Sequence, residues 1–214
     1  MTCFFDSRRT NRLYKKLRSS IPIAKTELIY STHFELLIAV MLTAQAADKT
    51  VNEVTPSLFK KCPSPKSFIL YGEKKIAHFI KRIGLAPTKA KNIVRTCRIL
   101  LKKHNGVIPK TREELVELPG VGRKTANVVL NEAFGIPTIA VDTHVFRVAN
   151  RTGLARGKTV LETEKKLLEV TPDKWKKDAH HYLILHGRYV CKAKNFECSS
   201  CSINRECQFE NKTK

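Results

Sequence analysis

Lys124 is the residue of this sequence whose position most favours covalent chemistry. It follows the stretch Leu118–Arg123, in which two glycines are separated by one residue. Apolar residues recur at helical spacing from Ala126 until Gly135, so the pattern predicts that Lys124 lies in the first turn of a helix. The positive end of the helix dipole, with Arg123 beside it, favours the neutral amine over the ammonium ion. A neutral lysine is a nucleophile, and such lysines form Schiff bases with carbonyl-like carbons.

Two short helices joined by a tight turn are needed to position this lysine. Thr111 and Glu114 have the spacing of a capping box, which predicts the start of the first helix, and Pro119 ends it. Gly120 and Gly122 are both expected to allow positive φ in the turn and a close approach of the backbone to another molecule. Amides at the start of the second helix would then face an anion such as a phosphate.

Two nucleotide-binding loops of similar composition do not fit this stretch. A P-loop requires glycine five residues before its second glycine, but Glu117 stands there, and Arg123 follows Gly122 where lysine is required. A dinucleotide-binding loop requires a third glycine, where Thr125 stands, and a preceding strand, where a helix is predicted. The spacing leaves two alternatives for Lys124: a nucleophile, or a solvated lysine on a DNA-binding hairpin.

Four cysteines near the end of the chain have the spacing of a metal-ligand set. Six, two and five residues separate Cys191, Cys198, Cys201 and Cys207. The N-terminal residues carry charges where a signal peptide needs an apolar core, so we expect a cytoplasmic protein, in which cysteine clusters bind metal more often than they form disulfides. Common zinc patterns contain two Cys-x2-Cys pairs, and this set contains one. The spacing leaves zinc and a [4Fe-4S] cluster as alternatives.

The charge of the chain indicates a polyanionic partner. Lysine and arginine number 40 against 19 aspartates and glutamates, a net charge of +21 over 214 residues. Nucleic acid is the commonest polyanion that such a protein meets. The longest unbroken apolar run, Leu36–Leu42, is far too short to span a bilayer, so we expect no membrane association.

Helical periodicity runs through the chain, and no stretch is a convincing strand. Apolar stripes predict helices over 8–20, from Thr32, over 74–83, through 93–101, over 159–170 and over 173–186. Leu85–Thr88 is expected to be a loop. Residues 136–141 are expected to form an extended connector that leads to Asp142, which is typical of the N-cap of a following helix.

Together these features resemble the helix-hairpin-helix DNA glycosylase superfamily, and within it the endonuclease III family, over nearly the whole chain. The resemblance lies in residues 118–131, residues 138–147 and the cysteine spacing. It implies that Lys124 is the Schiff-base nucleophile, that Asp142 is the catalytic carboxylate, and that the cysteines hold a [4Fe-4S] cluster. Because glycosyl cleavage transfers no electrons, we expect the cluster to have a structural role. Asp142 could accept a proton, orient a water or stabilise positive charge on the sugar.

The resemblance also implies which residues contact DNA. Gln45, otherwise an ordinary surface amide, would enter the space left by an extruded base, and Leu85, otherwise a packing residue, would act as a wedge in the base stack. Ala86 and Pro87 stand where the family usually has a bulkier residue. Further DNA contacts are expected from Gly120, Val121, Gly122, Arg123, His144, Lys192 and Lys194.

An all-α fold in two lobes is the architecture that the resemblance implies. Residues 26–136 would form a helical barrel domain that ends in the hairpin, and residues 1–25 with 137–214 would form a second domain with the cluster loop at 187–210. The implied function is a bifunctional DNA glycosylase and AP lyase that removes oxidised or ring-saturated pyrimidines from duplex DNA in base excision repair. It would act as a monomer in the cytoplasm, on the nucleoid in a bacterium.

Two alternative functions remain open at the level of sequence. A monofunctional glycosylase of the same superfamily would lack lysine at position 124 and would normally carry a further C-terminal domain, whereas this chain ends soon after Cys207. A DNA-binding module without catalytic activity would explain the charge, the hairpin and the cysteines. Such a module would not explain the pairing of Lys124 with Asp142.

Overall fold

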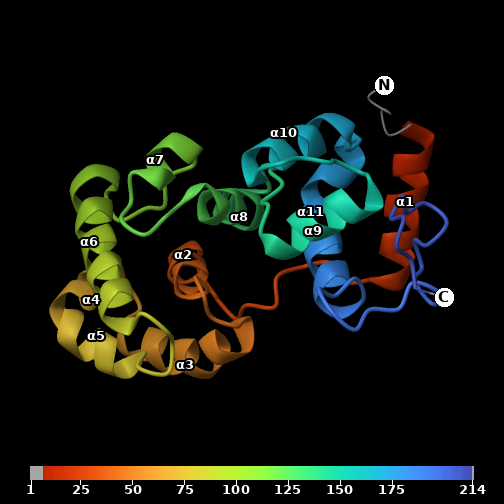
Figure 1. The fold of residues 1–214 in the computed structure, drawn as a ribbon. Coiled ribbons are helices and arrows are strands. Elements are labelled where there is room, and N and C mark those ends of the chain that lie inside the picture. The colour runs from red at the N-terminus through yellow and green to blue at the C-terminus, as the bar shows by residue number, and fades with distance from the viewer. Residues whose placement is uncertain (1–6, 214) are drawn as a thin grey trace. The chain divides into compact units, whose positions relative to one another are not determined.

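The computed structural model describes residues 7–213, which form helices joined by turns and loops and include no strand (Figure 1). The all-α prediction is therefore confirmed over this range. The chain divides into two compact units: Glu27–Gly135, and Met1–Thr26 together with Ile136–Lys214. Cys3, and most of the N-terminal segment whose charges argue against a signal peptide, lie outside the described residues.

The unit Glu27–Gly135 is built around a helix that is apolar on all sides. Its helices are α2 (His33–Leu42), α3 (Asp48–Lys61), α4 (Pro65–Tyr71), α5 (Glu73–Phe79), α6 (Ala86–His104), α7 (Arg112–Val116) and α8 (Arg123–Phe134). Every residue of α2 except His33 and Glu35 is buried, because α3, α6 and α8 all pack against it (Figure 1). The Thr32 hydroxyl caps α2 by accepting a hydrogen bond from the Glu35 amide at 3.1 Å.

Two predicted boundaries in this unit are wrong. The helix expected over 74–83 ends at Phe79, and the buried side chains of Ile80 and Ile83 belong to the turns that follow. Residues Ala86, Pro87 and Thr88 are not a loop but the first turn of α6, where proline is tolerated because its missing N–H would have no partner within the helix. The apolar pattern did not single out α3 and α4. Pro56 within α3 and the seven-residue length of α4 both weaken a periodic signal.

The second unit is assembled from the two ends of the chain. Its helices are α1 (Ser7–Ser20), α9 (Thr143–Thr152), α10 (Val160–Val170) and α11 (Asp173–Tyr189). α11 packs against both α9 and α1, and it continues three residues beyond the predicted end at His186. Tyr14 is fully buried, stacks on Trp175 with ring centroids 5.8 Å apart and shares a 3.0 Å hydrogen bond with Thr171. The N-terminal helix is therefore part of this core.

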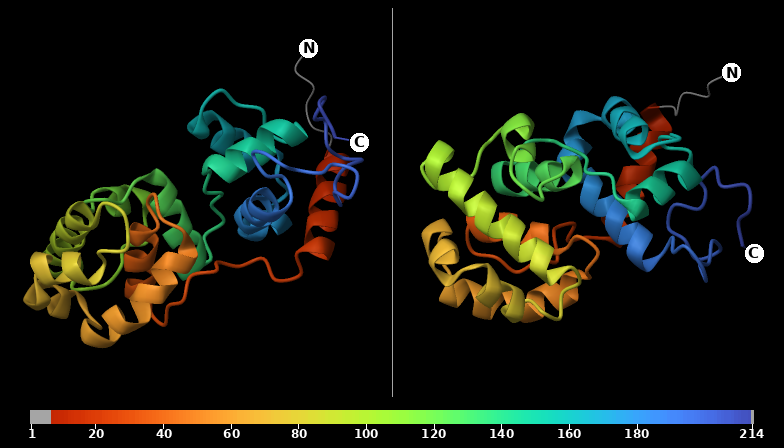
Figure 2. Two further views of the ribbon diagram at one scale, coloured as in Figure 1. Left: turned by 60° about the horizontal axis from the view of Figure 1, so that its bottom comes forward. Right: turned by 60° about the vertical axis from the view of Figure 1, so that its left-hand side comes forward.

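The C-terminal segment after α11 is an irregular loop that lies against α1 (Figure 2). Lys16 of α1 forms a 2.9 Å ion pair with Glu206, whose side chain is almost fully buried. Arg9 donates hydrogen bonds to the Glu206 carbonyl oxygen, one of them at 2.7 Å. These contacts attach the loop with the four cysteines to the helical core of the same unit.

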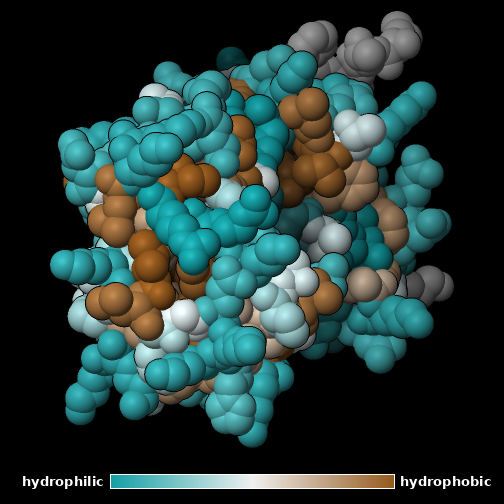
Figure 3. Space-filling view, turned by 90° about the vertical axis from the view of Figure 1, so that its left-hand side faces the viewer, coloured by the Kyte–Doolittle hydropathy of each residue, from teal (hydrophilic) through white to brown (hydrophobic). Residues whose placement is uncertain are grey.

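The surface is consistent with the charge of the chain. The face on the side where α4 and α6 lie in Figure 1 is mostly hydrophilic, and its hydrophobic side chains occupy separate areas rather than one continuous patch (Figure 3). Within residues 7–213, the helices are all too short or too polar to cross a membrane.

Candidate active site and cysteine loop

The predicted helix, turn and helix around Lys124 are present. Thr111 begins α7 by accepting a hydrogen bond from the Glu114 amide at 3.3 Å. α7 ends at Val116, and Leu118 beyond it is buried. After the turn, α8 begins at Arg123 and ends before Gly135, which adopts the left-handed conformation typical of a helix C-terminus.

The two glycines of the turn differ in backbone conformation and in the space around them. Gly120 has φ +82°, and a Cβ added to it would lie 3.0 Å from Asn92 Nδ2. Gly122 has φ −89°, and an added Cβ would meet no atom within 4 Å. The turn therefore adopts the expected positive φ at Gly120 and not at Gly122. The fold therefore has room for a side chain at Gly122, which is exposed directly before the first residue of α8.

Lys124 is the second residue of α8, as the periodicity predicted. It is half-buried, and Arg123 before it is exposed. The first turn of α8 contains no acidic residue, so no side chain of that turn neutralises the positive end of the helix dipole. Val121 differs from its neighbours because its side chain is buried and its N–H donates to the Leu118 carbonyl at 3.0 Å. Amide contacts from this turn to an anion would come from the residues after Val121.

Asp142 lies in the other unit and is the N-cap of α9, as predicted. Its Oδ1 accepts hydrogen bonds from the amides of His144 and Val145, both at 2.8 Å. These bonds hold the carboxylate in place and leave its Oδ2 outside the cap. The extended connector before it is buried at Ala140, and the carbonyl of Ala140 lies 2.7 Å from Nδ1 of His180 in α11. The pairing of Asp142 with Lys124 remains a prediction.

Gln45 and Leu85 occupy adjacent turns and share an unusual backbone conformation. Gln45 lies between α2 and α3 with φ 56°, and Leu85 precedes α6 with φ 62°. Both side chains are exposed, that of Leu85 by 54%. A Cβ on Gly84 would lie 3.8 Å from the Gln45 carbonyl oxygen, so the turns are in van der Waals range. Left-handed non-glycine residues are uncommon and concentrate at functional sites.

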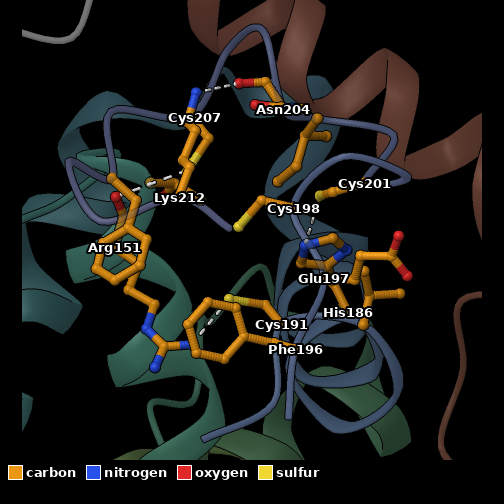
Figure 4. A pocket seen from close by; sticks show the side chains of 14 residues that line it. Arg151, His186, Cys191, Phe196, Glu197, Cys198, Cys201, Asn204, Cys207 and Lys212 are labelled. Atoms are coloured by element: carbon orange, nitrogen blue, oxygen red, sulfur yellow. Dashed lines mark hydrogen bonds between the residues drawn. The ribbon is translucent and has the colours of Figure 1, made fainter. Parts of the chain in front are cut away.

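The four predicted ligands line one pocket at the end of α11. Cys191, Cys198, Cys201 and Cys207 surround a common space (Figure 4), and all are free thiols. The other two described cysteines, Cys62 and Cys97, are buried in the unit Glu27–Gly135.

Positive and polar groups lie close to these sulfur atoms. Arg151 Nη1 is 3.5 Å from the sulfur of Cys191, and His186 Nε2 is 3.7 Å from the sulfur of Cys201 (Figure 4). Burial lowers the pKa of His186 to about 4, so its ring is neutral at physiological pH. Among residues 7–213, no group of three or more His, Cys, Asp or Glu side chains is arranged to hold a single metal ion.

Two arginines of α9, which the sequence did not single out, shape the cysteine loop. Arg151 donates to the carbonyl of Lys192 at 2.7 Å, and its guanidinium carbon lies 4.2 Å from the ring centroid of Phe196. Arg147 donates to the carbonyl of Cys191 at 3.0 Å. The two arginines are four residues apart and therefore share one face of the helix that Asp142 caps. Their spacing in the sequence could have indicated that they share a helix face. It could not have indicated the carbonyl oxygens that they contact, because these lie about forty residues later in the sequence.

The remaining predicted DNA-contacting residues lie on the same unit. His144 is half-buried, and its Nδ1 is 3.2 Å from Nη2 of Arg147. Lys192 and Lys194 are exposed on the loop between the first two cysteines. The positions of these residues allow contact with a polyanion, and the contacts themselves stay predictions.

Comparison with known proteins identifies the class to which this fold and site belong. Residues 38–173 match the model of the HhH-GPD superfamily of base excision DNA repair proteins. A structure described as a trapped endonuclease III–DNA covalent intermediate superimposes with a TM-score of 0.90 at 44% identity and covers 95% of this chain and 96% of that chain. A thermostable thymine-DNA glycosylase at 20% identity shares the fold, with a TM-score of 0.85 over 94% of this chain and 96% of that chain. The fold and site thus define a base excision repair protein of the HhH-GPD superfamily.

The family within this class follows from closer relatives. The endonuclease III proteins of Haemophilus influenzae and Escherichia coli are each 54% identical over 197 residues, which cover 92% of this chain and 93% of those proteins. The chain belongs to the endonuclease III family, whose members are DNA glycosylases with AP lyase activity. The predicted family, fold class and enzyme class are confirmed.

Proposed function

We propose that this protein removes oxidised or ring-saturated pyrimidines from duplex DNA and then cleaves the strand at the abasic site, with Lys124 as the nucleophile. The observation that carries the proposal is the half-buried Lys124 in the first turn of α8, directly after the exposed Gly122 and Arg123. The position would place a lysine beside a DNA phosphate, in a chain that is 54% identical to endonuclease III proteins. A structural relative at 44% identity is described as a covalent intermediate with DNA.

Lys124 supplies the chemistry through one nitrogen. Its neutral Nζ attacks C1′ of the damaged nucleotide as the bond from C1′ to the base breaks, and the departing base takes the electron pair of that bond. The positively charged nitrogen then gives one proton to the departing base anion. O4′ takes a proton as its bond to C1′ breaks, and the opened sugar carries a protonated Schiff base at C1′. The Schiff base acidifies the proton on C2′, and removal of that proton expels the 3′ phosphate by β-elimination.

Asp142 is the proposed carboxylate partner in this reaction. Its Oδ1 is held by two amides at the start of α9, so the group keeps a fixed orientation without the entropy cost of ordering it during the reaction. In that position it serves to accept the proton from Lys124, to orient a water, or to stabilise positive charge on the sugar. All three roles require its negative charge.

Duplex DNA is the proposed partner, held by three sets of contacts. The first is the turn that contains Gly120 and Gly122 and leads to Arg123, where the exposed N-terminus of α8 suits a phosphate. The second is the pair Gln45 and Leu85, which would occupy the space of the extruded base and the neighbouring base step. The third is the basic loop after Cys191, which carries Lys192 and Lys194. Phosphate contacts of this kind provide affinity that falls steeply with salt.

We assign the four cysteines, which line one pocket, to a [4Fe-4S] cluster rather than to zinc. Common zinc patterns contain two Cys-x2-Cys pairs, whereas this set contains one, and the endonuclease III family is known for iron-sulfur proteins. Glycosyl cleavage transfers no electrons, so the cluster would supply only structure, by closing the loop that carries the basic residues.

Trapping with borohydride tests the assignment of Lys124. The protein is incubated with a duplex that contains one oxidised pyrimidine, in the presence of borohydride, which reduces a Schiff base to a stable amine. We expect a covalent adduct with the parent protein and none with Lys124→Ala. The matched control is Lys102→Ala, which removes an exposed lysine from α6 and should leave the adduct intact.

Strand cleavage by Lys124→Ala would show that the assignment is wrong. A parent protein that binds the lesion duplex but forms no adduct would instead favour a monofunctional glycosylase or a binding module. A duplex with ring-saturated thymine, assayed beside one with 8-oxoguanine, tests the substrate class. Preferential cleavage of the 8-oxoguanine duplex would contradict the proposed preference for pyrimidines.

A further inference from the structure

Lys89 carries a buried positive charge to which the proposed reaction assigns no role. The residue is 7% exposed, and its Nζ donates a hydrogen bond to the carbonyl of Leu42 at 2.9 Å. This carbonyl is the side chain's one hydrogen-bond partner within residues 7–213. Burial lowers the pKa of the Lys89 ammonium group. Because lysine is almost never buried without a partner for its charge, the contact with Leu42 accounts for the position of this side chain.

Two turns are joined by the side chain and the backbone of Lys89. Leu42 is the last residue of α2, where the negative end of the helix dipole favours a cation. The backbone N–H of Lys89 donates to the carbonyl of Leu85 at 2.9 Å. Lys89 therefore binds the end of α2, three residues before Gln45, through its side chain, while its backbone lies in the helical turn that follows Leu85. Only the contact with Leu42 depends on the lysine side chain.

The conformation of these two turns requires support from their surroundings. Gln45 and Leu85 are both left-handed, with φ 56° and 62°, although neither is glycine. Such a conformation persists only where neighbouring contacts enforce it. Leu85 is the N-cap of α6 and has no side-chain cap. Its turn is held by the first backbone hydrogen bond of α6, which does not depend on the side chain at position 89, and it lies next to the Gln45 turn.

We propose that Lys89 is a positioning residue that fixes Gln45 and Leu85 as a pair, so that both side chains enter the duplex together. This inference rests on the proposed function, in which these two side chains insert into DNA. A pair that is ordered before binding loses less conformational entropy on insertion, and affinity rises accordingly. Loss of the contact between Lys89 and Leu42 therefore weakens binding to a lesion duplex, in which bases are displaced. Binding to an undamaged duplex does not require insertion and is unaffected.

Lys89→Met tests this inference, because methionine has a similar length but no donor and no charge. Dissociation constants are measured for a duplex with a stable analogue of an abasic site and for the undamaged duplex of the same sequence. We expect binding to the lesion duplex to weaken about tenfold, and binding to the undamaged duplex to change by less than about twofold. An equal loss for both duplexes would overturn the inference.

The matched control is Lys91→Met. Lys91 lies on the same helix, two residues further on, and is exposed. Its substitution removes the same charge without touching the turns. We expect the affinities for the lesion and undamaged duplexes to change by the same factor, because a surface charge acts on the phosphates of both. A lesion-specific loss in Lys91→Met as large as that in Lys89→Met would overturn the inference.

A double-mutant cycle separates positioning from a direct contact with DNA. In a variant with Gln45→Ala and Leu85→Ala, the further change Lys89→Met should weaken lesion binding by less than about twofold, because the side chains that it positions are already absent. A further loss of about tenfold would show that Lys89 acts independently of them. Thermal unfolding is measured for every variant. If Lys89→Met does not fold, Lys89→Leu, which also lacks a donor and a charge, replaces it and is judged by the same outcomes.

The same cycle distinguishes failure of the inference from failure of the proposed function. If the variant without the Gln45 and Leu85 side chains binds the lesion duplex as tightly as the parent, the proposed insertion of these side chains into DNA is wrong. The proposed role of Lys89 is then wrong as well. If that variant binds weakly while Lys89→Met binds like the parent, only the inference about Lys89 is overturned.

Discussion

Replacement of Gly120 by alanine should destabilise the protein through a local and calculable strain. Gly120 has φ +82°, and an added Cβ would lie 3.0 Å from Nδ2 and 3.1 Å from Cβ of Asn92. The left-handed conformation costs an alanine about 1–2 kcal/mol, and the Asn92 side chain must also move. We therefore expect Gly120→Ala to lower the free energy of unfolding by about 2 kcal/mol.

Gly122→Ala is the matched control for this prediction, two residues away in the same turn. Gly122 has an ordinary φ of −89°, and no heavy atom lies within 4 Å of an added Cβ. The free energy of unfolding should change by less than about 1 kcal/mol. The new methyl group would instead lie beside the first amides of α8 and hinder a phosphate, so we expect DNA affinity to fall about tenfold.

The assay is urea unfolding followed by helical circular dichroism, together with DNA binding for the parent and both variants. Gly120→Ala should shift the midpoint of unfolding without a change in the slope. A Gly120→Ala variant as stable as the parent would refute the strain calculated from its conformation. A Gly122→Ala variant that binds DNA as the parent does would refute a phosphate contact at the N-terminus of α8.

Three further predictions concern the other elements of the site. Asp142→Asn should leave stability within about 0.5 kcal/mol, because asparagine also caps helices, but should reduce strand cleavage by about 10²–10⁴-fold; cleavage at the parent rate would contradict a catalytic carboxylate. Arg151→Met removes the bonds to the loop between Cys191 and Cys198, so the visible absorbance of the proposed cluster should bleach several-fold faster in air. Arg98→Met, which removes an exposed arginine from α6, should bleach as the parent does. Affinity for undamaged duplex should fall about 10³-fold or more between about 50 and 200 mM salt, and a nearly flat dependence would argue against a large set of phosphate contacts.

Local features of this protein could be predicted from the sequence. The cap residues Thr111 and Asp142, the placement of Lys124 in the first turn of α8 and the close spacing of the cysteines all depend on residues within a few positions of one another. Backbone amides and side-chain oxygens that are only a few residues apart form hydrogen bonds without contributions from distant parts of the chain. The two helices and the turn around Lys124, and the resemblance to the family, could therefore be inferred from the sequence alone.

The predictions that failed concern positions where a distant neighbour decides the conformation. Apolar periodicity placed Ile80 and Ile83 in a helix because it records that these side chains are buried, but they are buried from turns. Pro87 marked a break in the pattern, and the chain uses it inside the first turn of α6.

Tertiary structure alone decided which features support the site. The distinction between Gly120 and Gly122 depends on Asn92, about thirty residues earlier in the chain. The contact between Lys89 and Leu42 spans 47 residues, and the arginines of α9 reach carbonyls about forty residues later. A residue pattern shows which side chains face the interior. It does not show which partner each will meet there, because that depends on how the helices pack around one another.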